Sequence, residues 1–423
     1  MNKNRSETIK IIPSAKRLVN SLRDLGYDFS QAVADLVDNS ITAGAQTISI
    51  DLRFDGPDSW FRLVDDGCGM TGSETTEAMR YGAQQSYGDE DLGKFGLGLK
   101  TASLSQCRRL TVASRRGPSR KRIEVRQLDL DHVSECDSWE IFVLSATDCE
   151  KRVVEPLHSG SGTVVMWESL DRVLGYKIPW GRRAESALES LAEQLELHLG
   201  MTFHRFISAE VAGRDPISIT INNETVPAWD PFARSEKATV VLPATDIDVT
   251  TSESVGLVRF QPYVLPPREQ FSSDEAFNWY SGPRKWNAQQ GFYIYRANRL
   301  IQGGGWCRMR ALDEHLKLAR AALDFYPELD SAFEINVSKA RAVLPADLRE
   351  NLQVEVEDLA RTAQAAYRSQ GLHEVRSTSR GTNHDVRDAL EGAARRTGGL
   401  RALKRIVKDL QETNSSVAKR LGW

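Results

Sequence analysis

Three short segments rich in aspartate, asparagine and glycine constrain this chain of 423 residues more than any other feature of its sequence. The first, D-L-V-D-N at 35–39, lies inside a predicted helix at 30–42. The second, D-D-G-C-G-M at 65–70, directly follows a predicted strand at 60–64. The third, G-K-F-G-L-G-L-K at 93–100, precedes a helix-forming run. Their order and combination are more informative than any one segment, and they lie in a region that mixes helices with alternating strands.

The first segment places a carboxylate and an amide on one helix face. Asp35 and Asn39 are four residues apart, so their side chains share a face of the helix. Such a pair is a poor choice for a core, because unpaired polar groups are costly to bury. It suits a magnesium site, in which the amide oxygen is a hard ligand and the carboxylate holds a water molecule. A solvated helix face explains this segment equally well when it is taken alone.

The second segment is suited to contact with a flat heterocyclic base. Asp65 can accept a hydrogen bond from an exocyclic amine, and the glycines let the backbone approach the base closely. An acidic turn is the commoner explanation of an Asp-Gly pair, so the segment taken alone favours a turn.

The third segment combines glycines with two lysines. Backbone N–H groups at the start of a helix can cradle phosphates, and Lys94 and Lys100 add positive charge. The spacing differs from the GxxxxGK[ST] pattern of a P-loop, and the context of a dinucleotide-binding fingerprint is missing. By itself this loop is weak support for phosphate binding.

Together, these segments resemble the motifs of the GHKL superfamily, which includes DNA gyrase B, heat-shock-90 chaperones, histidine kinases and MutL. D-L-V-D-N resembles its N-box, D-D-G-C-G-M its adenine motif, and G-K-F-G-L-G-L-K its phosphate-binding loop. G-S-G-T at 160–163, followed by V-V-M-W, resembles its final Gly-Thr motif, and the four motifs occur in order over residues 31–167. The resemblance implies that the chain binds ATP with Mg²⁺ and hydrolyses it slowly to drive a conformational cycle.

The resemblance also assigns roles to individual residues. Asn39 is expected to bind Mg²⁺, and Asp65 to accept a hydrogen bond from the adenine amino group. The other expected contacts line the base (Gly69, Met70 and Thr163) or hold the phosphates (Lys94, Phe95, Gly96, Leu97, Gly98, Leu99, Lys100 and Thr101). Residues 81–92 resemble the mobile lid that closes over the nucleotide.

The expected catalytic base departs from the family pattern. The family usually has a glutamate four residues before the N-box asparagine, and Asp35 occupies that position here. Because its side chain is one methylene shorter, the attacking water is expected to sit less well, and the turnover rate stays open. Asp38 is the alternative base, although its helical phase is less favourable.

The second half of the chain contains a predicted strand pair and a later lysine. Residues 290–302 alternate aromatics and then turn at Ala297-Asn298. The run G-F-Y-I-Y-R-A-N-R-L-I looks most like MORC-type and related prokaryotic GHKL proteins. In the branch containing MutL, gyrase B and MORC, a second domain resembling ribosomal protein S5 provides a catalytic lysine that contacts the terminal phosphate. The run I-N-V-S-K, which ends at Lys339, resembles the motif of that lysine. Arg341 is an alternative phosphate contact. Without the resemblance, this lysine would be expected to face solvent.

The expected fold is therefore α+β. It comprises a Bergerat-type ATP-binding α/β sandwich at 1–178, a connecting helix at 179–210, a ribosomal-S5-like second α/β domain at 211–370 and a basic, partly helical C-terminal segment at 371–423. The elements predicted after residue 210 include strands at 217–227, 238–242, 255–264, 292–301 and 333–337 and helices at 311–323, 347–370 and 400–410.

Composition limits the setting of the protein. No run of about 18 apolar residues occurs, and the N-terminus lacks the apolar core of a secretory signal. The five cysteines are scattered without a CxxC pair, which indicates reduced thiols in a cytoplasmic protein and gives no signal for zinc. All seven histidines follow the N-box, which disfavours a histidine kinase with its upstream phosphoacceptor.

The C-terminal region is the most basic part of the chain. Residues 373–423 hold 11 Lys and Arg against 6 Asp and Glu. Such a tract can neutralise nucleic-acid phosphates or dock a partner protein, but it is more often a solvated helix face. We expect an ATP-dependent homodimer that works as an ATP-gated clamp, with DNA as one candidate client. The alternatives are a chaperone-like protein remodeller and an ATP-binding switch with negligible turnover.

Overall fold

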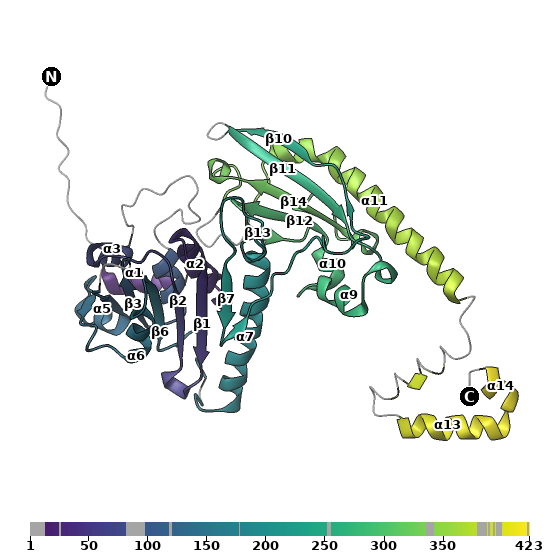
Figure 1. Cartoon of the computed structure of the whole chain (residues 1–423), viewed down its shortest axis with the longest axis horizontal. Coiled ribbons are helices and arrows are strands. Elements are labelled where there is room, and N and C mark those ends of the chain that lie inside the picture. The colour runs from purple at the N-terminus through teal and green to yellow at the C-terminus, as the bar shows by residue number, and fades with distance from the viewer. Residues whose placement is uncertain are drawn as a thin grey trace.

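The computed structural model of the chain (Figure 1) describes residues 13–24, 27–81, 98–117, 121–176, 178–251, 255–335, 342–378 and 400–420, together with 387, 390, 391, 394 and 423. Within these residues the chain forms two β-sheets with helices packed against them, followed by a helical C-terminal part. The expected mixed α/β architecture is therefore confirmed.

The first sheet contains β2, which ends at the predicted adenine motif, and β6, which begins in the predicted Gly-Thr motif. Its order is β5-β4-β3-β6-β2-β1-β7-β8. Its strands are β1 (Thr47–Arg53), β2 (Trp60–Asp65), β3 (Arg109–Arg115), β4 (Glu124–Asp129), β5 (Phe142–Leu144), β6 (Gly162–Glu168), β7 (Ser218–Ile221) and β8 (Glu224–Thr225). Strand β2 is antiparallel to both β1 and β6, and Asp65 lies opposite Thr163. This register brings the adenine motif and the Gly-Thr motif to the same end of the sheet.

The two faces of this sheet are covered by different helices. On one face lie α1 (Ala15–Arg23), α2 (Phe29–Thr42), α4 (Gly98–Leu104) and α7 (Arg182–Thr202). Phe61 and Leu63 of β2 point into that core, whereas the alternate residues Trp60 and Val64 join a smaller cluster with α6 (Lys151–Val154). Helices α3 (Gly72–Ala78) and α5 (Leu130–Cys136) complete this part of the chain. Period-two alternation thus buries both faces of the strand that ends in Asp65.

The first sheet extends further along the chain than the sequence indicated. We expected the strand at 217–227 to belong to the second domain, but β7 pairs in parallel with β1, with Thr47 opposite Ser218. Strand β8 then pairs with β7. The expectation was wrong because alternating apolar residues such as Ile219 and Ile221 identify a strand but not its partner.

The second sheet has the order β10-β11-β14-β12-β13, with β9 attached to β11. Its strands are β9 (Val240–Val241), β10 (Thr245–Thr250), β11 (Val255–Val264), β12 (Gly291–Arg296), β13 (Arg299–Gly303) and β14 (Ala319–Phe325). Helix α11 (Ala346–Thr378) packs along β10, β11 and β14 (Figure 1), and residues of α9 (Asp274–Tyr280) and α10 (Lys285–Gln289) join the same core. The predicted turn at Ala297-Asn298 joins β12 to β13, with φ values of 45° and 69°.

Two predictions in this second part of the chain are wrong. The helix expected at 311–323 is replaced by a short 3-10 turn (Glu314–Leu316) and the strand β14, which lies between β11 and β12. Its alanines and leucine favour a helix locally, but pairing on both sides decides the structure. The strand expected at 333–337 is absent from its described part, where residues 331–334 form turns and Phe333 stacks on Phe325 with 4.0 Å between ring centroids.

Helix α7 stands at the boundary between the two sheets (Figure 1), because it contacts α2 and β1 on one side and β13 on the other. The short helix α8 (His204–Ile207) follows it. At the C-terminal end, α13 (Leu400–Thr413) confirms the predicted helix at 400–410, and α14 (Ser415–Arg420) follows. Among the helices in the described ranges, none combines the length and apolar character needed to cross a membrane.

Candidate nucleotide-binding site

Helix α2 carries the first group of predicted site residues. Asp28 begins the helix, and its carboxylate accepts a hydrogen bond of 2.8 Å from the backbone N–H of Gln31. The side chains of Asp35 and Asp38 are buried, with 3% and 1% exposed, whereas Asn39 is exposed. The helix therefore presents an amide at the surface one turn beyond a buried carboxylate. Amide and carboxylate oxygens are hard donors, so this set fits Mg²⁺.

Asp35 lies where three parts of the chain meet. The Tyr27 hydroxyl donates a hydrogen bond of 2.9 Å to its Oδ2 atom. Burial and the nearby Asp35 charge raise the pKa of Tyr27 far above its ordinary value, so the hydroxyl stays a donor. A Cβ added to Gly98, the first residue of α4, would lie 3.5 Å from the same Oδ2 atom. The Arg299 guanidinium of β13 lies 3.8 Å from Oδ1.

Asp65, at the end of β2, has a buried carboxylate that accepts three hydrogen bonds. The Ser40 hydroxyl donates to Oδ2 at 3.0 Å, and the backbone N–H groups of Gly67 and Thr163 donate to Oδ1 at 3.0 and 3.2 Å. Burial raises the pKa of Asp65 to about 6, although these hydrogen bonds act in the opposite direction. A carboxylate oxygen can accept more than one hydrogen bond, so Oδ2 has the capacity to receive an adenine amino group.

Two glycines near Asp65 allow backbone segments to approach each other closely. Gly69 has a φ of 64°, and a Cβ added there would lie 2.0 Å from the Arg115 carbonyl oxygen. Gly162 has a φ of 144°, and a Cβ added there would lie 2.0 Å from the Asp65 carbonyl oxygen. Both positions therefore require glycine.

Ser114 of β3 links the residues predicted to line the base. Its hydroxyl oxygen accepts a hydrogen bond of 2.8 Å from the backbone N–H of Met70. The same oxygen lies 3.0 Å from the Thr163 Oγ1 atom and 2.9 Å from the Gly162 carbonyl oxygen, to which it donates. The structure thus brings Asp65, Met70 and Thr163 together, as the order of motifs predicted.

The predicted phosphate loop is described only from Gly98 onward. Leu99 is half-buried and Thr101 is fully buried in α4. The Lys100 ammonium donates hydrogen bonds to the carbonyl oxygens of Ala78 (3.0 Å), the last residue of α3, and of Arg80 (2.7 Å), just after it. Burial lowers the pKa of Lys100 to about 8. The predicted contacts that lie outside the described residues are Lys94, Phe95, Gly96, Leu97, Lys339 and Arg341, together with lid residues 82–92.

Sequence reasoning missed several residues that build this site. Tyr27, Ser40 and Ser114 have no distinctive local pattern, because a single hydroxyl is common on any helix or strand. Arg299 lies in the segment that predicted the strand pair, yet nothing in that segment shows that its guanidinium reaches α2. The two acids Asp35 and Asp38 on one predicted helix are the signal that could have suggested a distant cation, because acids that become buried are usually paired.

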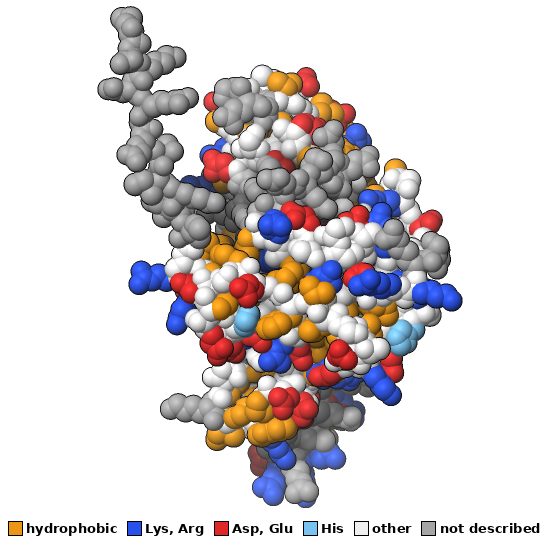
Figure 2. Space-filling model, turned by 90° about the vertical axis from the view of Figure 1, so that its left-hand side faces the viewer, with side chains coloured by type: hydrophobic (Ala, Val, Ile, Leu, Met, Phe, Trp, Pro, Cys, Tyr) orange, Lys and Arg blue, Asp and Glu red, His pale blue; other side chains and the backbone are white. Residues whose placement is uncertain are grey.

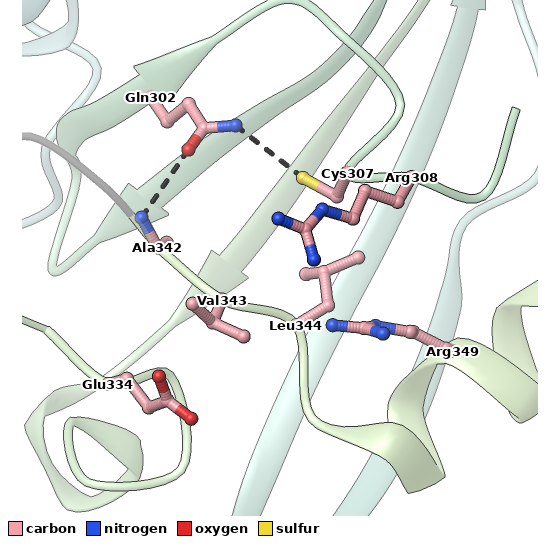
Figure 3. A pocket seen from close by; sticks show the side chains of 8 residues that line it. All are labelled: Gln302, Cys307, Arg308, Glu334, Ala342, Val343, Leu344 and Arg349. Carbon is pink, nitrogen blue, oxygen red and sulfur yellow. Dashed lines mark hydrogen bonds between the residues drawn. The ribbon is translucent and has the colours of Figure 1, made fainter. Parts of the chain in front are cut away.

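A cavity of about 430 Å³ lies beside β13 in the second half of the chain (Figure 3). Arg308, Arg349 and Glu334 contribute charged side chains to its wall. The Gln302 amide crosses one side of it, accepting a hydrogen bond of 3.4 Å from the Ala342 backbone N–H and donating to the Cys307 sulfur at 3.5 Å. Ala342 directly follows the segment that contains Lys339 and Arg341, so β13 is tied to the chain on the far side of that segment.

Comparison with known proteins defines the class of the first domain. Residues 27–163 match the family described as histidine kinase-, DNA gyrase B-, and HSP90-like ATPase. This span contains Asp35, Asn39, Asp65 and the Gly-Thr motif, so the chain contains an ATP-binding domain of the GHKL class.

A curated relative gives a second, shorter likeness. Over 44 residues the chain is 50% identical to the DNA mismatch repair protein PMS1 of Arabidopsis thaliana. That match covers 10% of this chain and 5% of the plant protein. It is consistent with a MutL-like member of the GHKL class and covers too little of either chain to assign a shared activity.

Proposed function

We propose that this chain binds ATP with Mg²⁺ and hydrolyses it slowly, with Asp35 as the general base. Asp65 is the observation that carries this proposal. Its buried carboxylate is fixed by three donors, and one of them, Ser40, lies on the same helix as Asp35 and Asn39. Gly69 lets the adenine motif pack closely against the backbone of Arg115, which holds this segment beside Asp65. Base recognition and hydrolysis would therefore share one helix.

The chain's own groups supply the steps of hydrolysis. Mg²⁺, held by Asn39, would reduce the negative charge on the phosphates. Asp35 would take the proton of the attacking water while the water oxygen bonds to the terminal phosphorus and the bond to ADP breaks. Tyr27 donates to the Asp35 carboxylate and would limit its rotation. The products are ADP and inorganic phosphate, with the proton released from Asp35 to solvent.

Asp35→Asn tests the assignment of the base, because an amide has nearly the same shape but cannot accept the proton. We expect ATP affinity, measured by calorimetry, to stay within about threefold of wild type, and turnover to fall by about 10²–10⁴, the usual contribution of a general base. Asp38→Asn is the matched comparison on the same helix. Equal turnover in wild type and Asp35→Asn, with turnover lost in Asp38→Asn, would transfer the role to Asp38.

We further propose that ATP drives closure and association of two copies, with Lys339 contacting the terminal phosphate. The place of Lys339 in the sequence supports this proposal, because Lys339 follows the last strand of the second sheet. It can contact a nucleotide bound at the first sheet only when the two sheets are suitably arranged. A contact that exists with ATP but not with ADP is the differential interaction that a shift between two states requires.

DNA is the client that we favour, and α13 is the surface proposed to meet it. Figure 2 shows acidic and basic side chains interspersed over the described surface at the N-terminal end of the molecule, which is a weak arrangement for binding a polyanion. Helix α13, in contrast, exposes Lys404, Arg405 and Lys408. The short likeness to a mismatch repair protein also favours DNA. Stimulation of the ATPase by DNA, weakened by salt, would support this client, and stimulation only by an unfolded protein would favour a chaperone-like role.

A binding-only switch is the second candidate. It is favoured by the short side chain of the base and by the cation that lies 3.8 Å from it. Tight ATP binding without release of phosphate over many hours would establish this alternative.

A further inference from the structure

Arg299 joins the second sheet to the acids of α2. It is the first residue of β13, and only 4% of its side chain is exposed. Its Nε atom donates a hydrogen bond of 2.9 Å to the Asp38 Oδ1 atom, and another guanidinium nitrogen lies 3.8 Å from the Asp35 Oδ1 atom. The two acids stand on one helix, three residues apart, and the cation that bridges them comes from a strand 261 residues after Asp38.

The Arg299 guanidinium lies between the two acids. Two buried carboxylates three residues apart on one helix repel each other, and a positive charge between them offsets this repulsion. The guanidinium also fixes the Asp38 carboxylate by a direct hydrogen bond. Where this cation lies depends on where β13 lies, because Arg299 is the first residue of that strand.

The position of Arg299 is set by the hairpin that precedes it. Ala297 and Asn298 have positive φ values and turn the chain between β12 and β13. Ala297 packs against the core of the first sheet, and the Arg299 guanidinium lies 5.8 Å from the centroid of the Phe203 ring. The tip of a hairpin of the second sheet thus rests on the first sheet's helices beside Asp35.

A separate ion pair at the same boundary does not touch these acids. Arg205 of α8 pairs with Asp324 of β14, and its guanidinium lies 3.6 Å from the centroid of the Tyr295 ring. Arg205 also donates a hydrogen bond of 3.3 Å to the Asn298 side chain in the hairpin turn. The substitution Asp324→Asn therefore weakens the ion pair between α8 and the second sheet and leaves this bond to the hairpin and the Arg299 cation in place.

We propose that Arg299 is a positioning residue that orients Asp35 for hydrolysis while the β12–β13 hairpin is docked on α2. This rests on the proposed role of Asp35 as the base. Near the other end of β13, the Gln302 side chain accepts a hydrogen bond from the backbone N–H of Ala342. A displacement of β13 would therefore change the surroundings of Asp35 and also the chain next to the segment that contains Lys339. Hydrolysis is thereby coupled to the position of the second sheet through a single strand.

The test compares Arg299→Ala and Arg299→Lys with Asp324→Asn. We expect Arg299→Ala to lower kcat by about a hundredfold, the scale on which a general base acts, with the Kd for ATP changed by less than about threefold. Arg299→Lys restores the positive charge but not the planar guanidinium, and it should recover at least about tenfold of that loss. Asp324→Asn should lower kcat by less than about threefold, because it leaves Arg299 and the hairpin's hydrogen bond to Arg205 in place. Arg299→Gln, which retains an amide donor without charge, should show the loss even if Arg299→Ala does not fold.

Several outcomes would overturn the proposal. Unchanged or increased kcat in folded Arg299→Ala or Arg299→Gln, with Asp35→Asn inactive, removes the positioning role and leaves the proposed function intact. An equal loss in Arg299→Ala and Asp324→Asn, without rescue by Arg299→Lys, would show that Arg299 only holds the two parts of the chain together. A wild-type protein that binds ATP but never hydrolyses it refutes both the proposed ATPase and this role.

Discussion

Replacing Asp65 with asparagine should damage the site while leaving the fold as stable as before, or more so. The carboxylate is 6% exposed and accepts hydrogen bonds from Ser40, Gly67 and Thr163. An amide of the same shape can accept through its oxygen only, and its N–H₂ group then faces either one of these donors or the adenine amino group. The substitution removes a buried charge at the cost of one mismatched donor.

The magnitude follows from the pKa of Asp65. One pKa unit corresponds to about 1.4 kcal/mol, so raising the pKa from 3.8 to about 6 costs the charged fold about 3 kcal/mol. The mismatched donor in the variant costs about 1–3 kcal/mol. At pH 7 the variant should therefore match wild type or exceed it by up to about 2 kcal/mol in free energy of unfolding.

The raised pKa also sets how the stability of the fold depends on pH. The folded pKa lies above the unfolded one, so the fold holds a proton that the unfolded chain has already released. Wild type should lose about 3 kcal/mol of stability relative to Asp65→Asn as pH rises from about 4 to about 6, and the difference should then stay constant. Other groups titrate alike in both proteins and cancel.

Denaturant unfolding of wild type and variant across this pH range measures the difference, and calorimetry measures ATP affinity at pH 7. We expect affinity to fall at least about tenfold, since a buried donor is left facing a donor. Asp66→Asn is the matched control, because Asp66 accepts only backbone N–H groups of Gln46 and Thr47 among its described hydrogen bonds. Parallel pH curves, or undiminished ATP affinity, would refute the reasoning.

Three further predictions concern other parts of the site. Asn39→Ala should change the free energy of unfolding by less than about 0.5 kcal/mol, because Asn39 is exposed, yet it should abolish the Mg²⁺-dependent ATP binding that calorimetry measures. Unchanged binding would exclude a role for Asn39 in holding the metal. Gly69→Ala should lower the free energy of unfolding by more than about 2 kcal/mol in chemical denaturation, whereas Gly44→Ala should lower it by only about 1 kcal/mol, because Gly44 has a φ of 76° but no neighbour within 4 Å. Equal losses would show that the chain near Gly69 relaxes freely. Lys339→Ala should weaken the dimerisation that light scattering detects with a non-hydrolysable ATP analogue by about tenfold, if the lysine–phosphate interaction stabilises closure by about 1.4 kcal/mol. ADP binding should stay unchanged, and dimerisation equal to that of wild type would make Lys339 a surface residue.

The sequence predicted the part of the site that depends on residue type and local order. Asp65 is the last residue of β2, one residue beyond the predicted strand at 60–64, and the Asp-Gly turn follows it as expected. The antiparallel pairing that sets Thr163 opposite Asp65 is a property of the sheet, yet the order of motifs was enough to predict that the two residues belong to one site. Asp35 and Asn39 of α2 were singled out by their helical spacing, with Asp38 as the alternative base.

The rest depends on contacts between distant segments. The residues of β14 favour a helix locally, and only the strands on either side make them a strand. Arg299 reaches Asp38 across 261 residues, and no local pattern encodes such a contact. The three donors around Asp65 come from a helix, a turn and a strand, so their convergence is visible only after folding.

The pairing of β7 with β1 has a practical consequence for dissecting the protein. A fragment that stops at residue 178 would leave the backbone N–H and C=O groups of β1 open to solvent along the flank that β7 covers. It would also strip α7, with the buried Leu188, Leu195 and Leu199, from the first core. Such a piece invites intermolecular strand pairing and aggregation. The shortest piece expected to stay monodisperse while binding nucleotide runs at least through Val226, the last buried residue of that core.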